Sequence, residues 1–399
     1  MTENEKTKKT PALRFKGFTD DWEQRKVSDM FRVTRGYVLP ATVTKKSPDE
    51  INQYPVYSSQ TADNGLMGYY KDYLYEDAVT WTTDGANAGT VRFRPGKFYC
   101  TNVCGVLLSN KIKASRMIAE ALNLVTKKHV SYVGNPKLMN NVMEEIEISL
   151  PSSPREQENI SCLFESLDTL ITLHQKKVSS LQIIKKSMLE KMFPKEGSKV
   201  PEIRFSGFTD DWEQRKVSEI TKFHKQGFYT TENYDSNKKY YLLRGTDITD
   251  NKLILKDTPR INATEADYQA FKTQVGDFRI VRSGTVGTYG IVYDDIPAIF
   301  GSYLIDFRFD MEQVTNEFFG YFYQSDSFKG QLRQIIQQSA NTNINAENIK
   351  STCIKLPALD EQCAISKFFL SLDTLITLHQ RKLDDLKALK KCLLQEMFI

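Results

Sequence analysis

PALRFKGFTDDWEQRKVS, residues 11–28, returns as PEIRFSGFTDDWEQRKVS, residues 201–218, with differences at only three positions. A second stretch, SLDTLITLHQ at residues 166–175, returns unchanged at residues 371–380. The sequence between the copies is unrelated. A chain that repeats its framework and varies its inserts predicts two equivalent arms that carry two different surfaces.

The bulk composition indicates a globular protein of two or three domains. The chain has 399 residues, and single cores rarely grow beyond roughly 250 to 300. Its apolar fraction of 40% is ordinary, and neither a membrane span nor an apolar signal core is visible, so we expect a cytoplasmic protein. Six scattered cysteines without a CxxC pair indicate reduced thiols and no zinc site. The net charge of +4 permits nucleic-acid binding without arguing for it.

The repeats divide the chain into six segments. The second insert is longer than the first, and a polar stretch, PKEGSKV, separates the two halves. The expected order is an N-terminal tail (1–19), a first variable domain (20–152), a central helix (153–193), a linker (194–209), a second variable domain (210–357) and a distal helix (358–399).

Both repeated helices carry apolar positions spaced alternately by four and three residues, which predicts a heptad seam. Each helix of about 33 residues would be roughly 50 Å long. The polar seam positions leave open whether the lysines fix the register or extend to water, and the histidines are better explained by packing than by catalysis. The predicted seam residues are Leu167, Ile171, His174, Val178, Leu181, Lys185, Met188 and Met192, and Leu372, Ile376, His379, Leu383, Leu386, Lys390, Leu393 and Met397.

Two helix starts are indicated by residue type. Ser153 and Glu156 flank Pro154 in the pattern of a capping box at the start of the central helix. In the repeated lead, Asp20 and Glu23 could form another cap, and Trp22 is expected to anchor the lead against the adjoining domain.

The two variable regions predict mixed strands and short helices, and therefore an α+β protein. Alternation around Val79 and Trp81, and around Ile280 and Arg282, indicates strands that end in glycine-rich turns. The aromatic run at 318–322 is typical of a helix.

Polar residues gather at three corresponding places in the two halves. Two glycine-rich turns, TTDGANAGT (82–90) and RSGTVGTYG (282–290), differ in their side chains, as do the runs YSSQTADNG (57–65) and YYLLRGTDI (240–248). The third place lies before each long helix, where Asn135 with Lys137 corresponds to Asn341 with Asn343. Arg and Asn can form paired hydrogen bonds to guanine and adenine, and Ser and Thr bond to several bases. The candidate DNA-contacting residues are Ser58, Ser59, Gln60, Thr61, Thr83, Asp84, Asn87, Asn135 and Lys137, and Arg244, Thr246, Asp247, Arg282, Ser283, Thr285, Asn341, Thr342 and Asn343.

Other interpretations stay open on the residues alone. Any single polar segment is equally well an ordinary solvated loop, and residues 282–290 could also hold a phosphate through backbone amides. An enzyme has no visible site, because the chain lacks a GxxxxGK[ST] phosphate loop and a GxGxxG motif. A scaffold whose variable regions bind proteins is the remaining alternative.

The order of lead, variable region and long helix, stated twice, resembles the specificity subunit of Type I restriction-modification systems. The resemblance includes LPSSPREQENI (150–160) and LPALDEQCAI (356–365) at the helix starts and covers essentially the whole chain after the N-terminal tail. The departures are small: Ala358 stands in the place of Ser153, and the second phrase is one residue shorter.

The resemblance implies an α+β fold in which two mixed α/β target recognition domains are joined by an antiparallel coiled coil with pseudo-two-fold symmetry. It implies that the chain is not catalytic and binds no cofactor itself. Its partners would be double-stranded DNA, two methyltransferase subunits that use S-adenosylmethionine, and motor-nuclease subunits that use ATP and magnesium. The helices would be the spacer and part of the methyltransferase docking surface. Because the inserts differ, the target would be asymmetric and bipartite.

Overall fold

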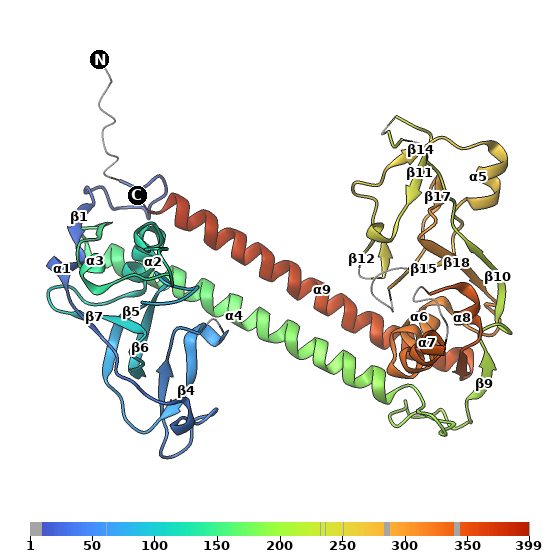
Figure 1. Ribbon diagram of the computed structural model, residues 1–399, viewed down its shortest axis with the longest axis horizontal. Coiled ribbons are helices and arrows are strands. Elements are labelled where there is room, and N and C mark those ends of the chain that lie inside the picture. The colour runs from blue at the N-terminus through green and yellow to red at the C-terminus, as the bar shows by residue number, and fades with distance from the viewer. Residues whose placement is uncertain are drawn as a thin grey trace. The chain divides into compact units, whose positions relative to one another are not determined.

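The structure is a computed structural model that describes residues 10–60, 62–231, 233–235, 237–249, 251–282, 288–338 and 344–398. It divides into two compact units: unit 1 comprises Met1–Gln175 with Gln380–Ile399, and unit 2 comprises Lys176–His379. Each unit therefore contains one variable domain and parts of both long helices, α4 (Pro154–Lys191) and α9 (Leu359–Glu396), drawn in green and red in Figure 1.

Unit 1 is built on a six-stranded sheet in the order β2-β7-β5-β6-β3-β4. Neighbouring strands are antiparallel except β3 and β6, which are parallel. Trp81 and Val79 on one face of β5 belong to the same core as Ile118 of helix α2. The elements are β2 (Phe31–Arg35), β3 (Tyr54–Tyr57), β4 (Leu66–Tyr70), β5 (Tyr75–Thr82), β6 (Val91–Cys100), β7 (Cys104–Ser109), α1 (Val27–Met30), α2 (Arg116–Val125) and α3 (Asn140–Glu144).

Unit 2 has a six-stranded sheet in the order β10-β18-β15-β16-β13-β12 and a three-stranded sheet in the order β14-β11-β17. Aromatic side chains fill its core, where Phe278 contacts Phe309 and Phe319 of helix α6. The elements are β10 (Thr221–Gln226), β11 (Tyr240–Leu243), β12 (Ile248–Thr249), β13 (Lys252–Leu253), β14 (Arg260–Ile261), β15 (Phe278–Val281), β16 (Tyr289–Ile291), β17 (Ala298–Phe300), β18 (Leu304–Phe309), α5 (Glu265–Phe271), α6 (Asn316–Gln324), α7 (Asp326–Gln338) and α8 (Ala346–Lys350).

The two variable domains share a strand plan although their sequences are unrelated. Strands β2, β7, β5 and β6 occupy the places that β10, β18, β15 and β16 hold in unit 2. The hairpin turns correspond as well, because Thr82 N donates to Thr90 O in one and Val281 N to Thr288 O in the other. The predicted α+β class, the strand at Val79 and Trp81 and the helix at 318–322 are confirmed. Strand β15 ends at Val281, so Arg282 begins the turn.

The repeated lead forms a strand that pairs with the end of its own variable domain. In unit 1, β1 (Glu23–Lys26) pairs with β8 (Glu147–Leu150), and in unit 2, β9 (Glu213–Lys216) pairs with β19 (Cys353–Leu356). The proposed cap between Asp20 and Glu23 is wrong, because Glu23 lies in an extended strand. The expected anchor is confirmed: Trp22 is 5% exposed and packs edge-on against Phe398.

Helix α4 starts at Pro154 as predicted, but Glu156 does not form the predicted capping box. The Glu156 carboxylate is fully buried and accepts from Arg14 Nε at 2.6 Å and Nη2 at 2.8 Å. The copy repeats this pair, with Glu361 accepting from Arg204 at 2.7 Å. The glutamate that local sequence assigned to the helix cap is therefore held by the arginine of the repeated lead.

The lead also contacts the far ends of the helices. Leu13 N donates to Glu396 O at 2.8 Å in unit 1, and Ile203 N donates to Lys191 O at 2.9 Å in unit 2. Residues 11–19, which the sequence assigned to a tail, and part of the 194–209 segment therefore lie against helix ends. Each copy of the lead therefore contacts the start of one long helix and the end of the other.

The long helices are antiparallel where they meet within each unit. In unit 1, Asp168 of α4 binds Lys390 of α9 at 2.8 Å, while the earlier Phe164 contacts the later Phe398. Unit 2 repeats the pattern with Asp373 and Lys185, whose atoms are 2.6 Å apart. Of the seam residues, Leu167, Val178, Leu181, Met192, Leu372, Leu383, Leu386 and Met397 are buried, and Ile171, His174, Lys185, Met188, Ile376, His379, Lys390 and Leu393 are half-buried.

The ion pairs answer the question about the seam lysines. The side chains of Lys185 and Lys390 are 16% and 19% exposed, and each binds an aspartate of the facing helix. They do not extend to water. Because a partly buried charge needs its partner at one place along the helix, these pairs favour one register over its neighbours.

Candidate nucleic-acid interface

Three polar segments of unit 1 meet at the β5–β6 turn. Asn87 in the turn donates to Ser59 O at 3.4 Å, which joins it to the loop after β3. Asp84 lies 3.7 Å from Lys137 Nζ, and Gly85 N donates to Pro136 O. The structure therefore brings together the three sets of residues that the sequence marked in this half.

Individual residues in this group differ in exposure. Gln60, Asn135 and Lys137 are exposed, whereas Ser58 and Ser59 are half-buried. Ser58 Oγ accepts from Thr101, and Ser58 N donates to Gly65 O, so this serine also shapes the loop. The Gln60 amide donates to Leu66 O and the Lys137 ammonium lies beside Asp84, so other parts of the fold position both groups at the surface.

The corresponding face of unit 2 has different chemistry at equivalent positions. Arg282 N donates to Tyr303 O, as Thr83 N donates to Val103 O in unit 1. The threonine of one unit is therefore an arginine in the other. Arg282 Nε lies 3.4 Å from Ile344 O, which ties the turn to the segment before α8.

Arg244 follows β11, as Ser58 follows β3. Strand β11 pairs in parallel with β17 and strand β3 with β6, and Gly301 N donates to Leu243 O as Thr101 N donates to Tyr57 O. Arg244 and the exposed Thr246 line a cavity of about 700 Å³. Three exposed tyrosines line the same cavity: Tyr229, Tyr234 and Tyr303.

Two predicted contact residues have structural roles instead. Asp247 is 4% exposed, and its carboxylate accepts from the backbone and side chain of Arg244 and from Thr258. Thr83 is 9% exposed and donates to Asp84 at 2.7 Å. Because neither side chain can reach a ligand, we interpret Asp247 as orienting Arg244 and Thr83 as orienting Asp84. Thr61, Ser283, Thr285, Asn341, Thr342 and Asn343 lie outside the described residues.

Sequence reasoning missed the tyrosines of unit 2 and two arginines of unit 1. Arg92 and Arg94 stand in strand β6 on the face that Thr80 and Thr82 share, and they line a small cavity beside the β5–β6 turn. The sequence contains a pattern that indicates these arginines. RFR at 92–94 puts two cations on one face of a strand whose other residues include Val91 and Phe93.

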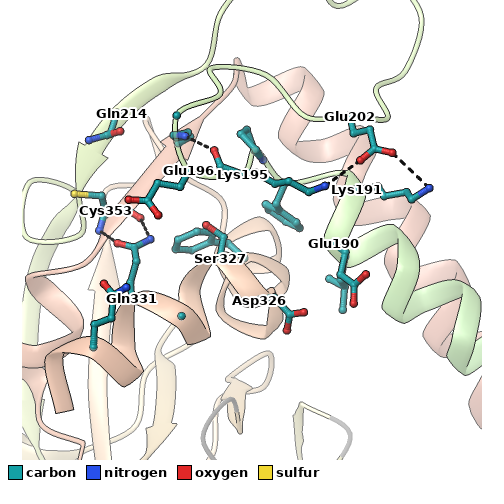
Figure 2. A pocket seen from close by; sticks show the side chains of 18 residues that line it. Glu190, Lys191, Lys195, Glu196, Glu202, Gln214, Asp326, Ser327, Gln331 and Cys353 are labelled. Carbon is teal, nitrogen blue, oxygen red and sulfur yellow. Dashed lines mark hydrogen bonds and ion pairs between the residues drawn. The ribbon is translucent and has the colours of Figure 1, made fainter. Parts of the chain in front are cut away.

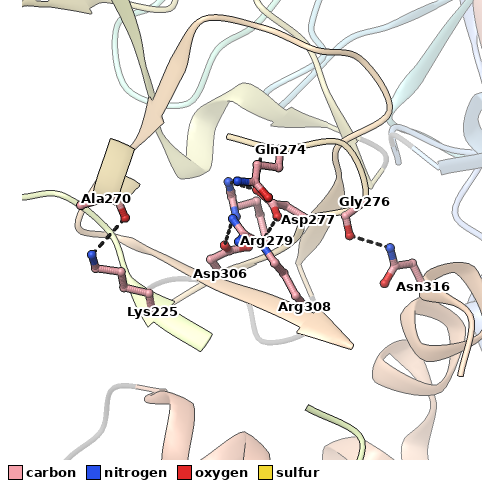
Figure 3. Close-up of polar contacts among 9 residues, drawn as sticks. All are labelled: Lys225, Ala270, Gln274, Gly276, Asp277, Arg279, Asp306, Arg308 and Asn316. Atoms are coloured by element: carbon pink, nitrogen blue, oxygen red, sulfur yellow. Dashed lines mark hydrogen bonds and ion pairs between the residues drawn. The ribbon is translucent and has the colours of Figure 1, made fainter. Parts of the chain in front are cut away.

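Unit 2 contains a buried ionic network at the paired strands β15 and β18 (Figure 3). Arg279 is fully buried and forms ion pairs with Asp277, at 2.6 Å, and with Asp306. Arg308 Nε donates to Asp277 at 2.6 Å. At the equivalent positions of the unit 1 sheet stand Thr80 and Val106, which are uncharged. The network therefore belongs to one variable domain only.

The cavity in Figure 2 lies at the end of α4, away from the recognition loops, and measures about 700 Å³. Its charged groups bind one another: Glu202 pairs with Lys191 and Lys195, and Lys355 donates to the Lys195 carbonyl. Such mutual pairing is typical of a structural junction. In the described part of the chain, no group of three His, Cys, Asp or Glu residues could hold a metal ion, and no helix has the length and apolarity to cross a membrane.

A family model described as Type I restriction modification DNA specificity domain matches residues 19–182 and again residues 209–388. This chain belongs to that family. Each match takes in a variable domain and much of a long helix, so the specificity subunit carries two DNA specificity domains in tandem. The family is the DNA-recognition part of the system and not a catalytic one, as the resemblance implied.

Relatives agree with this assignment. A putative type I specificity subunit N-terminus from Mycoplasma pneumoniae is 41% identical over 144 residues, which cover 35% of this chain and 75% of the relative. The chain spans 47% of another Mycoplasma pneumoniae specificity subunit, which is 37% identical over the matched part. The specificity subunit of the MjaVIII type I restriction enzyme of Methanocaldococcus jannaschii is 23% identical across 93% of this chain and 91% of its own.

Solved structures share the fold at low sequence identity. The S subunit of the Type I restriction-modification system from M. genitalium has a TM-score of 0.65 and 15% identity and covers 98% of this chain and 99% of its own. A chain from a structure of complex assembly of the type I restriction-modification system has a TM-score of 0.52 and 14% identity, covering 94% and 97%. At these identities the likeness shows the fold alone.

Proposed function

We propose that this specificity subunit directs a Type I restriction-modification complex to an asymmetric, bipartite DNA sequence in the cytoplasm. Each specificity domain reads one half-site. The observation that carries the proposal is the contrast in one hairpin, because unit 2 has Arg282 at the position of the buried Thr83, which in unit 1 orients Asp84. One strand plan with different polar side chains at its tip suits two surfaces that read different bases.

The chemistry of the two faces predicts different readers. In unit 1, Asn87, Gln60 and Asn135 offer amides, which can bond to adenine through its N6 and N7 atoms. In unit 2, Arg244 and Arg282 offer guanidinium groups, which favour guanine O6 and N7. The exposed Tyr229 and Tyr303 can pack against sugars or bases beside these contacts.

The chemistry of restriction and methylation belongs to partner subunits in this proposal. Two methyltransferase subunits dock on the repeated helices, where Leu173 and its copy Leu378 are 61% and 60% exposed. Large exposed apolar residues at repeated positions support two equivalent docking surfaces. S-adenosylmethionine, ATP and magnesium bind to the methyltransferase and motor-nuclease subunits, and this chain binds none of them.

The proposal is tested by footprinting the chain assembled with its methyltransferase subunits. We expect two protected segments of unlike sequence with an unread gap, and log K falling by ~0.9 per neutralised phosphate as log salt rises. The chain alone, given DNA, magnesium, ATP and S-adenosylmethionine, should neither cut nor methylate. Absence of any sequence-selective footprint would favour a protein-binding scaffold, and chemistry by the chain alone would favour an enzyme.

A further inference from the structure

A small polar cavity in unit 1 lies between the loop after β3 and the start of β6. It measures about 80 Å³, and its rim includes the side chains of Gln60, Asn87 and Thr90. Arg92 and Arg94 also line it. The amides of Gln60 and Asn87 already donate to Leu66 O and Ser59 O, so the two guanidinium groups give the cavity its positive charge.

Arg94 is fixed within this cavity by three contacts. Its Nε donates to Thr80 Oγ1 at 3.2 Å, its Nη2 donates to Asn64 O at 2.8 Å, and its guanidinium lies 3.6 Å from the centre of the Tyr57 ring. All three partners are uncharged. Burial lowers the pKa of Arg94 to about 10, so the side chain still carries its charge at neutral pH.

No carboxylate neutralises these arginines among the residues that the structure describes. Arg92 and Arg94 form no ion pair, and the carboxylates that act on Arg92 from a distance, Glu120 and Asp168, are both bound to Lys390. Unit 2 differs, because its buried Arg279 is held by two aspartates. A buried charge without a counter-charge is costly, so the cavity of unit 1 is electrostatically complete only with an anion.

We propose that this cavity binds a phosphodiester of the DNA half-site read by unit 1, with Arg94 and Arg92 supplying the positive charge. The inference rests on DNA binding by the specificity domain. A base edge is a poor match, because Arg94 is 8% exposed and tethered, whereas base-reading side chains must extend into a groove. Phosphates lie at the outside of the duplex and can enter a recess.

The test compares Arg94→Gln with the unchanged chain, each assembled with methyltransferase subunits, by DNA binding over a range of salt concentrations. We expect Arg94→Gln to weaken binding about tenfold near 0.1 M salt and to lower the salt slope by ~0.9, the value for one phosphate. Discrimination against substituted base pairs should be unchanged. Arg94→Lys should restore the slope, and Lys97→Gln, an exposed cation farther along β6, should leave both quantities unchanged.

A second measurement keeps the test decisive if Arg94→Gln unfolds unit 1. Single uncharged methylphosphonates are placed through the half-site, and one position should weaken binding by the unchanged chain and by Arg94→Lys. If Arg94→Gln folds, a methylphosphonate at that position should not weaken DNA binding by this variant. An unchanged salt slope, loss of discrimination at one base pair, or no sensitive phosphate would each overturn the inference. Absence of sequence-selective binding by the unchanged chain would instead refute the proposed function.

Discussion

A fragment that ends at Lys199 is expected to be a dimer in solution and to read a symmetric site. Such a fragment keeps the first specificity domain and α4 but lacks the end of α9, so Trp22 and Phe164 lose Phe398. The matching residue is Phe193, just after α4, because it makes the same contacts with Trp212 and Phe369 in unit 2. A second copy of the fragment can therefore supply Phe193 where Phe398 is missing.

The energy favours this exchange. Burying a large apolar side chain stabilises by about 1.5 to 3 kcal/mol, and each copy would bury Leu181, Met192 and Phe193 against the other. Two symmetric contacts exceed the lower estimates of the cost of association, so we expect dissociation constants near or below about 1 µM. Analytical sedimentation would measure the dissociation constant. A fragment with Phe193→Asp should be monomeric, and a monomeric unchanged fragment would show that the helix ends are not interchangeable.

Arg279→Met is expected to destabilise unit 2 by roughly 3 to 5 kcal/mol, the range for breaking a buried ion pair by removing one partner. The substitution keeps an apolar stem but leaves Asp306, which is fully buried, without its main counter-charge. Among the described residues, Arg308 is the one cation that remains beside it, at 3.6 Å. Hydrogen exchange should show faster opening of β15 and β18, and binding to the half-site read by unit 2 should fall while the other half-site is retained.

Unit 1 provides the matched control, because Thr80 and Val106 occupy the places of Arg279 and Asp306. The double variant Arg279→Thr with Asp306→Val should recover most of the lost stability, since a buried pair can be replaced by uncharged residues at little cost. If the double variant is no more stable than Arg279→Met, the loss comes from packing and not from the unpaired aspartate.

The same pair predicts a pH dependence. Burial outweighs the attraction of Arg279 and raises the pKa of Asp306 to about 6. The folded protein therefore holds a proton that the unfolded chain releases at lower pH, so the contribution of Asp306 to stability declines as pH rises from about 4 through 6. The double variant should lack this decline, which denaturation at several pH values would measure.

Much of the architecture follows from the repeats. The heptad spacing places Leu181 and Leu386 in the core, and the duplicated lead predicts equivalent anchors at Trp22 and Trp212. Predictions from local spacing were wrong where a side chain binds a partner that is distant in sequence. Glu156 fits a capping box by spacing, but Arg14, which is far away in sequence, forms two hydrogen bonds with it. No local pattern contains that information.

The recognition faces were only partly predictable for a related reason. Polar residues in turns suggest contact with a ligand, yet Asp247 and Thr83 face inward, and burial depends on tertiary packing. Arg94 was overlooked because the predicted contacts were taken from polar runs and turns, and it lies in strand β6. The equivalence of the two hairpins was predictable, since the glycine-rich turns stand at matching places in the repeats.

The measurement that tests the central claim most directly is methylation mapping with a chain whose residues 31–149 are exchanged for the same region of a relative. Methylated adenines would be mapped by single-molecule sequencing in cells that supply the methyltransferase subunits. We predict that one half-site changes, while the other half-site and the gap stay the same. A change in both half-sites, or in neither, would contradict the claim that two unlike domains on a repeated framework each read one half of the target.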